Sequence, residues 1–92
     1  MDQIIERFQN KDEKAFETLY KMYGVSIKGV IFNIVRDDDI AEEVMQDVFV
    51  SAWKNSETYS VKKGRFFTWL LNIARNAAID KTRYNRNRVF YF

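Results

Sequence analysis

Charged side chains of opposite sign follow one another in the second half of the chain. Six acidic residues occur in a stretch without Lys or Arg, namely Asp37, Asp38, Asp39, Glu42, Glu43 and Asp47. From Val61 onward the sign reverses, and only Asp80 stands against the basic residues Lys62, Lys63, Arg65, Arg75, Lys81, Arg83, Arg86 and Arg88. The formal net charge of +2 conceals this separation. The pattern predicts two binding surfaces, one for a basic partner and one for an acidic partner such as a nucleic acid.

The acidic stretch is predicted to be helical, and its acids have no basic residue three or four positions ahead. Ion pairs within the helix therefore do not relieve their mutual repulsion, which favours a basic partner from outside. Gln46 and Phe49 would add a hydrogen-bonding group and an apolar anchor to such an interface. The predicted protein-binding set is Glu42, Glu43, Gln46, Asp47 and Phe49.

Two other interpretations of these acids stay open. The first is an ordinary solvated helix face. The second is a set of paired carboxylates that binds Mg²⁺ or performs acid–base catalysis, as in a metal-dependent phosphoryl-transfer enzyme. The position of the acids at an exposed helix start, with no sign of a pocket, disfavours the catalytic interpretation.

The basic segment begins at a glycine between cations. Lys62, Lys63 and Arg65 surround Gly64 where a loop meets the start of a helix. Cationic side chains, free backbone N–H groups and the positive end of a helix dipole together suit phosphate. Aromatic residues flank the cluster, namely Tyr59, Phe66 and Phe67. Cations interleaved with flat rings are what single-stranded nucleic acid requires, although Phe66 taken alone is more typical of a core.

Further along the same helix, polar residues lie beside the apolar face. Arg75 and Asn76 can reach base edges there, and an Asn amide suits adenine. A buried amide without a partner would cost about 1–3 kcal/mol. We therefore expect Asn76 at the helix edge, close to Tyr59. Lys81 and Arg83 continue the basic series, for which a simple solvated face is the alternative.

Composition excludes several classes of protein. At 92 residues the chain is one domain, and its 47% apolar content is enough for a core. Without cysteine or histidine it has no disulfide, no thiolate or imidazole metal ligand and no histidine base. We expect neither catalytic activity nor a cofactor. No apolar run could span a bilayer and the first residues lack a signal peptide, so we predict a cytoplasmic protein without membrane insertion.

The apolar spacing predicts an all-α fold, a compact bundle of three main helices with a short extra N-terminal helix. Proline is absent and only three glycines occur, which favours long helices. The predicted elements are a first turn around Ile4–Phe8, a helix from the N-cap Asp12 to about Val35, a helix from Asp38 or Asp39, a loop over 55–64 and a helix from about Arg65.

Two details concern helix ends. Asp39 and Glu42 have the spacing of a capping box, so Asp39 is a candidate N-cap of the second main helix. Beyond Arg83 the chain is polar, and we expect the last helix to fray there. The apolar end over 89–92 has no evident role.

Three segments together resemble region two of the sigma-70 family of transcription initiation factors, and more narrowly its extracytoplasmic-function group. They are AFETLYKMY at 15–23, AEEVMQDVFVSAW at 41–53 and GRFFTWLLNIARNAAIDKTR at 64–83. The resemblance covers about residues 11–83. The joint match in order and spacing is specific, whereas any one segment alone would be weak.

The resemblance implies a helical bundle that docks on the clamp helices of the largest RNA polymerase subunit through its acidic helix. By position this implicates Glu43, Gln46, Asp47 and Phe49. It also implies that the loop and last helix bind the non-template strand of the minus-ten promoter element and capture a flipped base. The residues implicated there are Tyr59, Ile73 and Asn76.

Three further expectations accompany the resemblance. The loop Val61-Lys62-Lys63-Gly64 is more basic than the family's frequent Arg-Gly-Asp/Glu type, which leaves the preferred base open. The family's C-terminal helix-turn-helix domain is missing, so we expect an isolated domain or a truncated chain. An anti-sigma factor is a further possible partner. The alternative function is a helical protein-interaction module whose basic residues are incidental.

Overall fold

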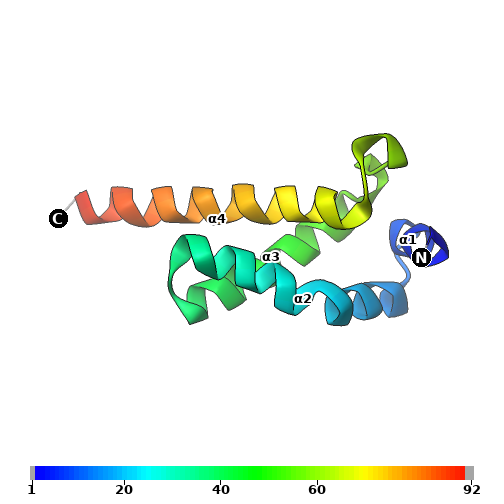
Figure 1. Cartoon of the computed structure of the whole chain (residues 1–92), viewed down its shortest axis with the longest axis horizontal. Coiled ribbons are helices and arrows are strands. Elements are labelled where there is room, and N and C mark those ends of the chain that lie inside the picture. Colours follow the sequence, from blue (N-terminus) through cyan, green and yellow to red (C-terminus); the bar gives the residue numbers. More distant parts are fainter. Residues whose placement is uncertain (1, 91–92) are drawn as a thin grey trace.

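The computed structural model describes the backbone of residues 2–90 and the side chains of residues 3–84. The described backbone forms helices and connecting turns without a strand, which confirms the predicted all-α class. The elements are α1 (Asp2–Gln9), α2 (Glu13–Val35), α3 (Asp38–Lys54), the short 3₁₀ turns η1 (Ser56–Thr58) and η2 (Val61–Lys63), and α4 (Phe66–Phe90) (Figure 1).

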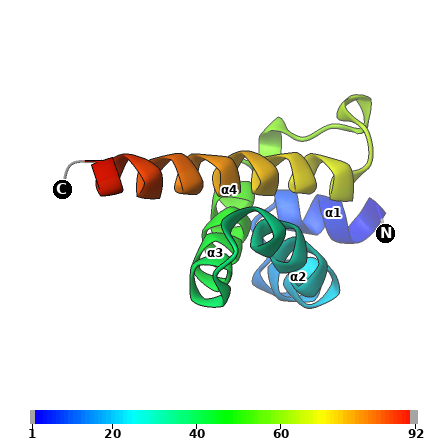
Figure 2. The ribbon, with the colours of Figure 1, turned by 60° about the vertical axis from the view of Figure 1, so that its left-hand side comes forward.

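The helices α2 and α3 form a hairpin, and α4 lies across it (Figures 1 and 2). The helix α1 lies at the end of the hairpin where the 55–64 loop leaves α3 and leads into α4, and it contacts η1 there. At the opposite end, α4 extends past the hairpin (Figure 1). The N-terminal helix is thus a neighbour of a loop some fifty residues later in the chain.

The core lies between α2, α3 and α4 and is closed at one end by α1. Large side chains that are fully buried come from all four helices, namely Phe8, Leu19, Ile27, Ile31, Val48, Phe49 and Leu70. The ring of Phe8 on α1 packs edge-on against Phe66 on α4, with 5.5 Å between centroids. It also stacks with Phe16 on α2 at 6.3 Å. These aromatic contacts hold the start of α4 and the N-terminal helix together.

The N-terminus of α2 is capped as predicted. Asp12 Oδ1 accepts a hydrogen bond from the backbone N–H of Lys14 at 2.9 Å. The side chain of Arg7 donates to Asp12 Oδ2 at 2.8 Å, and this bond, followed by the one from Lys14, lowers the pKa of the Asp12 carboxyl from its usual 3.8. The resulting stabilisation is present above pH 3.8 and is lost as the pH falls through the lower pKa of the folded state.

The N-cap of α3 is Asp37 rather than Asp39, so the predicted capping box is wrong. Arg36 ends α2 in the left-handed conformation (φ 60°), and Asp37 then lies in extended backbone directly before the first residue of α3. Its Oδ1 accepts from the N–H of Ile40 at 3.0 Å. Asp39 is already within the helix, where its side chain cannot cap.

Replacing Asp37 and Asp39 one at a time should show which of them stabilises the start of α3 as its N-cap. Asp37→Ala should lower the free energy of unfolding by about 1 kcal/mol, because the N–H of Ile40 loses its acceptor. Asp39→Ala removes the same charge two residues later and should change stability by less than about 0.5 kcal/mol. Urea unfolding followed by circular dichroism measures both. Equal losses would show that charge near the helix end, and not the cap, is what stabilises α3.

The last helix is longer than predicted. It continues without a break past Arg83 to Phe90, so the expected fraying after Arg83 is wrong for the backbone. The apolar end noted in the sequence begins in its last turn, and its side chains lie outside the described residues. The continuous helix carries the basic residues of its second half along one axis.

Candidate nucleic-acid and protein interfaces

The 55–64 loop is folded back on itself around Tyr59. The hydroxyl of Tyr59 donates to the carbonyl oxygen of Gly64 at 2.8 Å. Its ring packs edge-on against Phe66 and tilts against Trp69, with centroids 5.4 and 5.3 Å apart. Gly64 has a φ of 96°, a backbone conformation that residues other than glycine rarely adopt. Tyr59 is only 7% exposed, so it acts as a fixed wall and not as a mobile surface ring.

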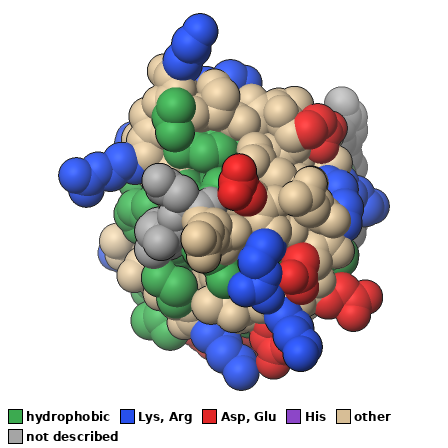
Figure 3. Space-filling model, turned by 90° about the vertical axis from the view of Figure 1, so that its right-hand side faces the viewer, with side chains coloured by type: hydrophobic (Ala, Val, Ile, Leu, Met, Phe, Trp, Pro, Cys, Tyr) green, Lys and Arg blue, Asp and Glu red, His purple; other side chains and the backbone are tan. Residues whose placement is uncertain are grey.

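An open cavity of about 590 Å³ lies beside this ring. Its walls are mostly apolar or aromatic and come from α1, α2, the loop and the first turn of α4, namely Ile5, Tyr23, Tyr59, Val61, Gly64, Arg65, Phe66 and Phe67. A smaller cavity of about 290 Å³ adjoins it between α1 and the loop. Figure 3 views this end of the molecule and shows hydrophobic side chains exposed there, with Lys and Arg side chains projecting around them. The walls offer flat apolar contact of the kind that an unstacked base requires.

Three cationic residues, here called the rim cations, belong to the segment that walls the cavity. Lys62 and Lys63 are the last two residues of η2, lie in the chain between the lining residues Val61 and Gly64, and are exposed. Arg65 is also exposed and lines the cavity just before α4. The segment that walls the cavity therefore carries three positive charges.

The remaining predicted nucleic-acid residues follow along α4. Arg75, Asn76 and Arg83 are exposed, whereas Ile73 and Lys81 are half-buried. The expected proximity of Asn76 to Tyr59 is wrong, because Tyr59 contacts the first turn of α4 through Phe66 and Trp69. Asn76 lies seven residues beyond Trp69, about 10 Å further along the helix axis at 1.5 Å per residue. None of these α4 residues lines the Tyr59 cavity.

No ion pair within α3 joins its acids among the described side chains, in agreement with the sequence pattern, but lysines of two other helices partly neutralise them. Lys28 of α2 lies 3.1 Å from Glu42 and 3.3 Å from Asp38. The hydrogen bonds to Glu42 and then Asp38 raise the pKa of Lys28. Lys81 of α4 lies 3.8 Å from Glu43. Glu42 thus joins α3 to α2 through an ion pair, in addition to adding negative charge to the surface.

Other polar groups of α3 stay available to a partner. Glu43, Gln46 and Asp47 are all exposed. Asp47 forms no ion pair with any side chain of residues 3–84. Among the side chains of residues 3–84, the amide of Gln46 donates to Glu42 alone, at 3.3 Å. These three residues therefore present an acidic and hydrogen-bonding face to solvent.

Phe49 does not belong to that face. It is 1% exposed, and its ring contacts Tyr20 at 5.0 Å and Phe16 at 6.3 Å, both on α2. The proposed role as an exposed apolar anchor is therefore wrong for this side chain. Phe49 lies in a second buried row of α3, with Ala41 and Met45, because α3 packs against α2 as well as α4.

Two findings concern alternative functions. No three acidic side chains among residues 3–84 converge on a point where they could hold a metal ion, so the geometry gives the phosphoryl-transfer interpretation no support. None of the helices in the described part of the chain is long and apolar enough to cross a membrane.

A family model described as Sigma-70 region 2 matches residues 19–88, about three quarters of the chain. The chain belongs to the sigma-70 region 2 family. The family consists of transcription initiation factors and not of enzymes, in agreement with the expected lack of catalytic activity.

Individual relatives of this region 2 domain point to the extracytoplasmic-function group. The chain is 30% identical over 83 residues to the ECF RNA polymerase sigma factor SigK of Mycolicibacterium vanbaalenii, covering 90% of this chain and 42% of that protein. It is 28% identical to SigK of Mycobacterium tuberculosis H37Rv, covering 90% of this chain and 44% of that protein. The chain thus spans less than half the length of these curated relatives.

A solved structure supports the same fold. An engineered region 2 of sigmaE in complex with GTAAAA, determined by NMR, aligns with a TM-score of 0.82 and 28% identity. The alignment covers 92% of this chain and 87% of that chain. The helical arrangement described above is therefore that of sigma region 2.

Sequence reasoning missed several residues of this region 2 surface. The cavity is lined by Ile5, Tyr23 and Val61 among others. In the sequence these residues look like ordinary core or loop positions, and their spacing does not distinguish them from other apolar residues. Thr68 and Asn72 are exposed on the same four-residue row of α4 as Asn76, and that polar row was a usable signal.

Proposed function

We propose that the 92 residues form one sigma region 2 domain that binds the non-template strand of the minus-ten promoter element while α3 docks on the RNA polymerase clamp helices. The observation that carries the proposal is the aromatic cavity beside Tyr59 with Lys62, Lys63 and Arg65 around it. Support comes from the sigmaE region 2 of the same fold, which was solved with GTAAAA.

The DNA surface combines two kinds of contact. The cavity beside Tyr59 receives an unstacked base, and the rim cations hold the adjoining phosphates. Along α4, Ile73, Arg75, Asn76 and Arg83 contact the following nucleotides, and Lys81 joins them when it leaves Glu43. Capturing unstacked bases makes strand separation less unfavourable, since unstacking costs about a few kcal/mol per step.

The protein surface is the acidic face of α3. Glu43, Gln46 and Asp47 are exposed there and can pair with basic residues of the clamp helices. Glu42 is half-buried and tied to Lys28, so it supports the face from its edge. An anti-sigma factor would compete for the same two surfaces.

Salt-dependent binding tests the DNA half of the proposal. The chain should bind a single-stranded GTAAAA oligonucleotide more tightly than a scrambled one. In a plot of the logarithm of the binding constant against the logarithm of the salt concentration, the slope should be about −0.7 for each neutralised phosphate. Replacing Lys62 and Lys63 together by Met should reduce the magnitude of that slope by about 1.4. Fluorescence anisotropy at several salt concentrations measures both quantities.

The control is a double variant that removes two charges elsewhere. Lys14→Met with Lys21→Met alters exposed lysines of α2, away from the cavity, and should leave the slope unchanged. Affinity that is independent of salt and of sequence would refute the DNA-binding proposal and favour a protein-interaction module.

A further inference from the structure

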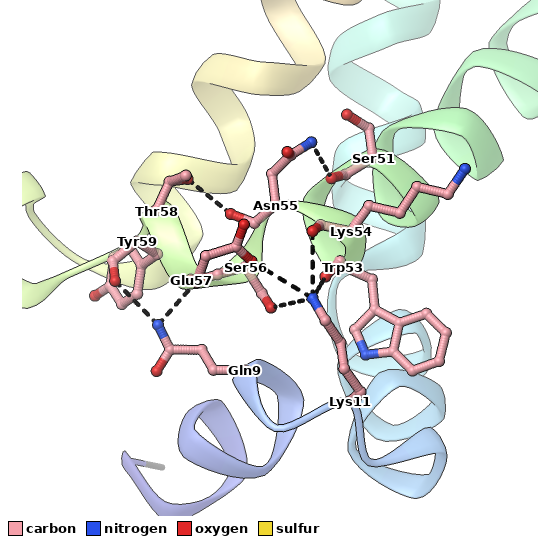
Figure 4. A network of polar contacts seen from close by, with 10 residues as sticks. All are labelled: Gln9, Lys11, Ser51, Trp53, Lys54, Asn55, Ser56, Glu57, Thr58 and Tyr59. Atoms are coloured by element: carbon pink, nitrogen blue, oxygen red, sulfur yellow. Dashed lines mark hydrogen bonds and ion pairs between the residues drawn. The ribbon is translucent and has the colours of Figure 1, made fainter.

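The turn between α1 and α2 holds the start of the 55–64 loop through side chains that belong to neither proposed surface. Figure 4 shows Gln9 and Lys11 directed toward the segment from Trp53 to Tyr59. The residues joined in this way are 42 to 50 positions apart in the sequence. The contacts are therefore a feature of the tertiary fold and not of the local turn.

Gln9 binds the backbone at the first residue of η1 and at the residue directly after it with one amide group. Its Nε2 donates to the carbonyl oxygen of Ser56 at 2.9 Å and to that of Tyr59 at 3.0 Å. The side chain is half-buried between α1 and the loop, where it also lines the smaller cavity. Both carbonyls would lose their described side-chain donor if Gln9 lost its amide nitrogen.

Lys11 binds the backbone at the C-terminal end of α3. Its ammonium group donates to the carbonyl oxygens of Trp53 and Lys54 and, at 2.9 Å, to the hydroxyl of Ser56. Carbonyls at a helix C-terminus lack partners within the helix and carry partial negative charge, so a cation there is favourable. Ser56 is completely buried, and Lys11 supplies its described side-chain hydrogen bond.

We infer that Gln9 and Lys11 are positioning residues for DNA binding, because Gln9 holds Tyr59 where it forms the wall of the base cavity and Lys11 holds Ser56 at the start of the same turn. This inference rests on the proposed function. Tyr59 is fixed at its carbonyl oxygen by Gln9, at its ring by Phe66 and Trp69, and at its hydroxyl by Gly64. A loop that is ordered before it binds loses less conformational entropy on binding than a loose one. Gln9 and Lys11 therefore raise DNA affinity through the loop, without lining the base cavity themselves.

The test removes the donor of Gln9 in two ways. Gln9→Met keeps the length of the side chain without a donor, and Gln9→Glu places a carboxylate against two carbonyl oxygens. Each variant should bind single-stranded GTAAAA about tenfold more weakly, as expected from the loss of two hydrogen bonds. The slope of affinity against salt should stay at the wild-type value, because the phosphate contacts are intact. The matched controls Gln3→Met and Gln3→Glu change an exposed glutamine of α1 and should have no effect.

A second measurement reads the loop without DNA. Amide hydrogen exchange should become faster at residues 58–64 in both Gln9 variants, while protection in the middle of α2 and α3 stays the same. Lys11→Met should accelerate exchange at the end of α3 and in η1, whereas Lys14→Met should not. Binding to the polymerase core, through the exposed face of α3, should be unaffected in every variant.

The outcomes separate this inference from the proposed function. Wild-type protein that binds neither GTAAAA nor the scrambled oligonucleotide would refute the proposed function, and loop exchange would still decide whether Gln9 and Lys11 hold the loop. Unchanged affinity and unchanged exchange in the Gln9 variants would overturn the inference. It would also be overturned if the variants lost helix content and core binding in parallel with DNA binding, since that would show a general structural role.

Discussion

Replacing Phe49 by alanine should lower the free energy of unfolding by about 3–5 kcal/mol, as expected for a large aromatic side chain deleted from a core. Phe49 is 1% exposed and contacts Phe16 and Tyr20, so its removal leaves a cavity between α3 and α2. Small domains have only about 5–15 kcal/mol of stability in total. The variant should therefore lose a large share of the stability of the domain.

Urea unfolding of Phe49→Ala and of its neighbour variant Val50→Ala measures the difference. Val50 is 42% exposed on the same helix, so its truncation should change stability by less than about 0.5 kcal/mol. The folded fraction of Phe49→Ala should still bind polymerase core normally. A variant of wild-type stability that fails to bind core would instead restore Phe49 as a docking anchor and contradict its buried position.

Reversing the charge of Glu43 and Asp47 together should weaken binding to polymerase core by about a hundredfold or more. Like charges brought together in an interface cost several kcal/mol, and the two lysines would meet the basic partner directly. Glu43 also loses its ion pair with Lys81, but at 3.8 Å and 61% exposure of the Glu43 side chain this pair adds little stability. The helix content and the unfolding midpoint should remain close to those of the wild type.

The matched control is Glu13→Lys with Glu17→Lys, which makes the same change at the same four-residue spacing on α2. Core binding of this control should stay within about twofold, allowing for screened long-range charge. Surface plasmon resonance against immobilised core enzyme measures the three proteins. Equal loss in both double variants would show that net charge, and not the α3 face, governs the association.

Most of the fold could be predicted because the spacing of apolar residues indicates where the main helices lie and which faces they bury. The recurrence of apolar residues at steps of three and four located α2, α3 and the start of α4, and Asp12 marked the start of α2. The sequence pattern pointed to Asp39 and missed Asp37 as the N-cap of α3, because the role of Asp37 depends on Arg36 leaving α2 in the left-handed conformation. That conformation is set by the tight turn between two packed helices and has no signature in the residue type.

The candidate site was predicted less completely, for a related reason. The sign of the charge on each helix could be read directly, but Lys28 opposite Asp38 and Glu42 could not, because α2 and α3 meet only in the folded chain. Phe49 was misplaced because α3 is packed from two sides, which widens its buried face beyond a single row. Asn76 was placed on the exposed face correctly, but its distance along α4 from Tyr59 was overlooked.

The link between Gln9 and the carbonyl oxygens of Ser56 and Tyr59 has a consequence for the order in which the protein is made. At about 5–20 residues per second, Gln9 leaves the ribosome several seconds before its two acceptors do. The helices α2 and α3 are neighbours in sequence and can pair early, whereas contacts between distant residues form late. The 55–64 loop therefore takes its folded shape only when both ends of this span are in place. A chain still being synthesised can therefore form the α2–α3 hairpin before the segment over 59–67 that walls the cavity has joined it.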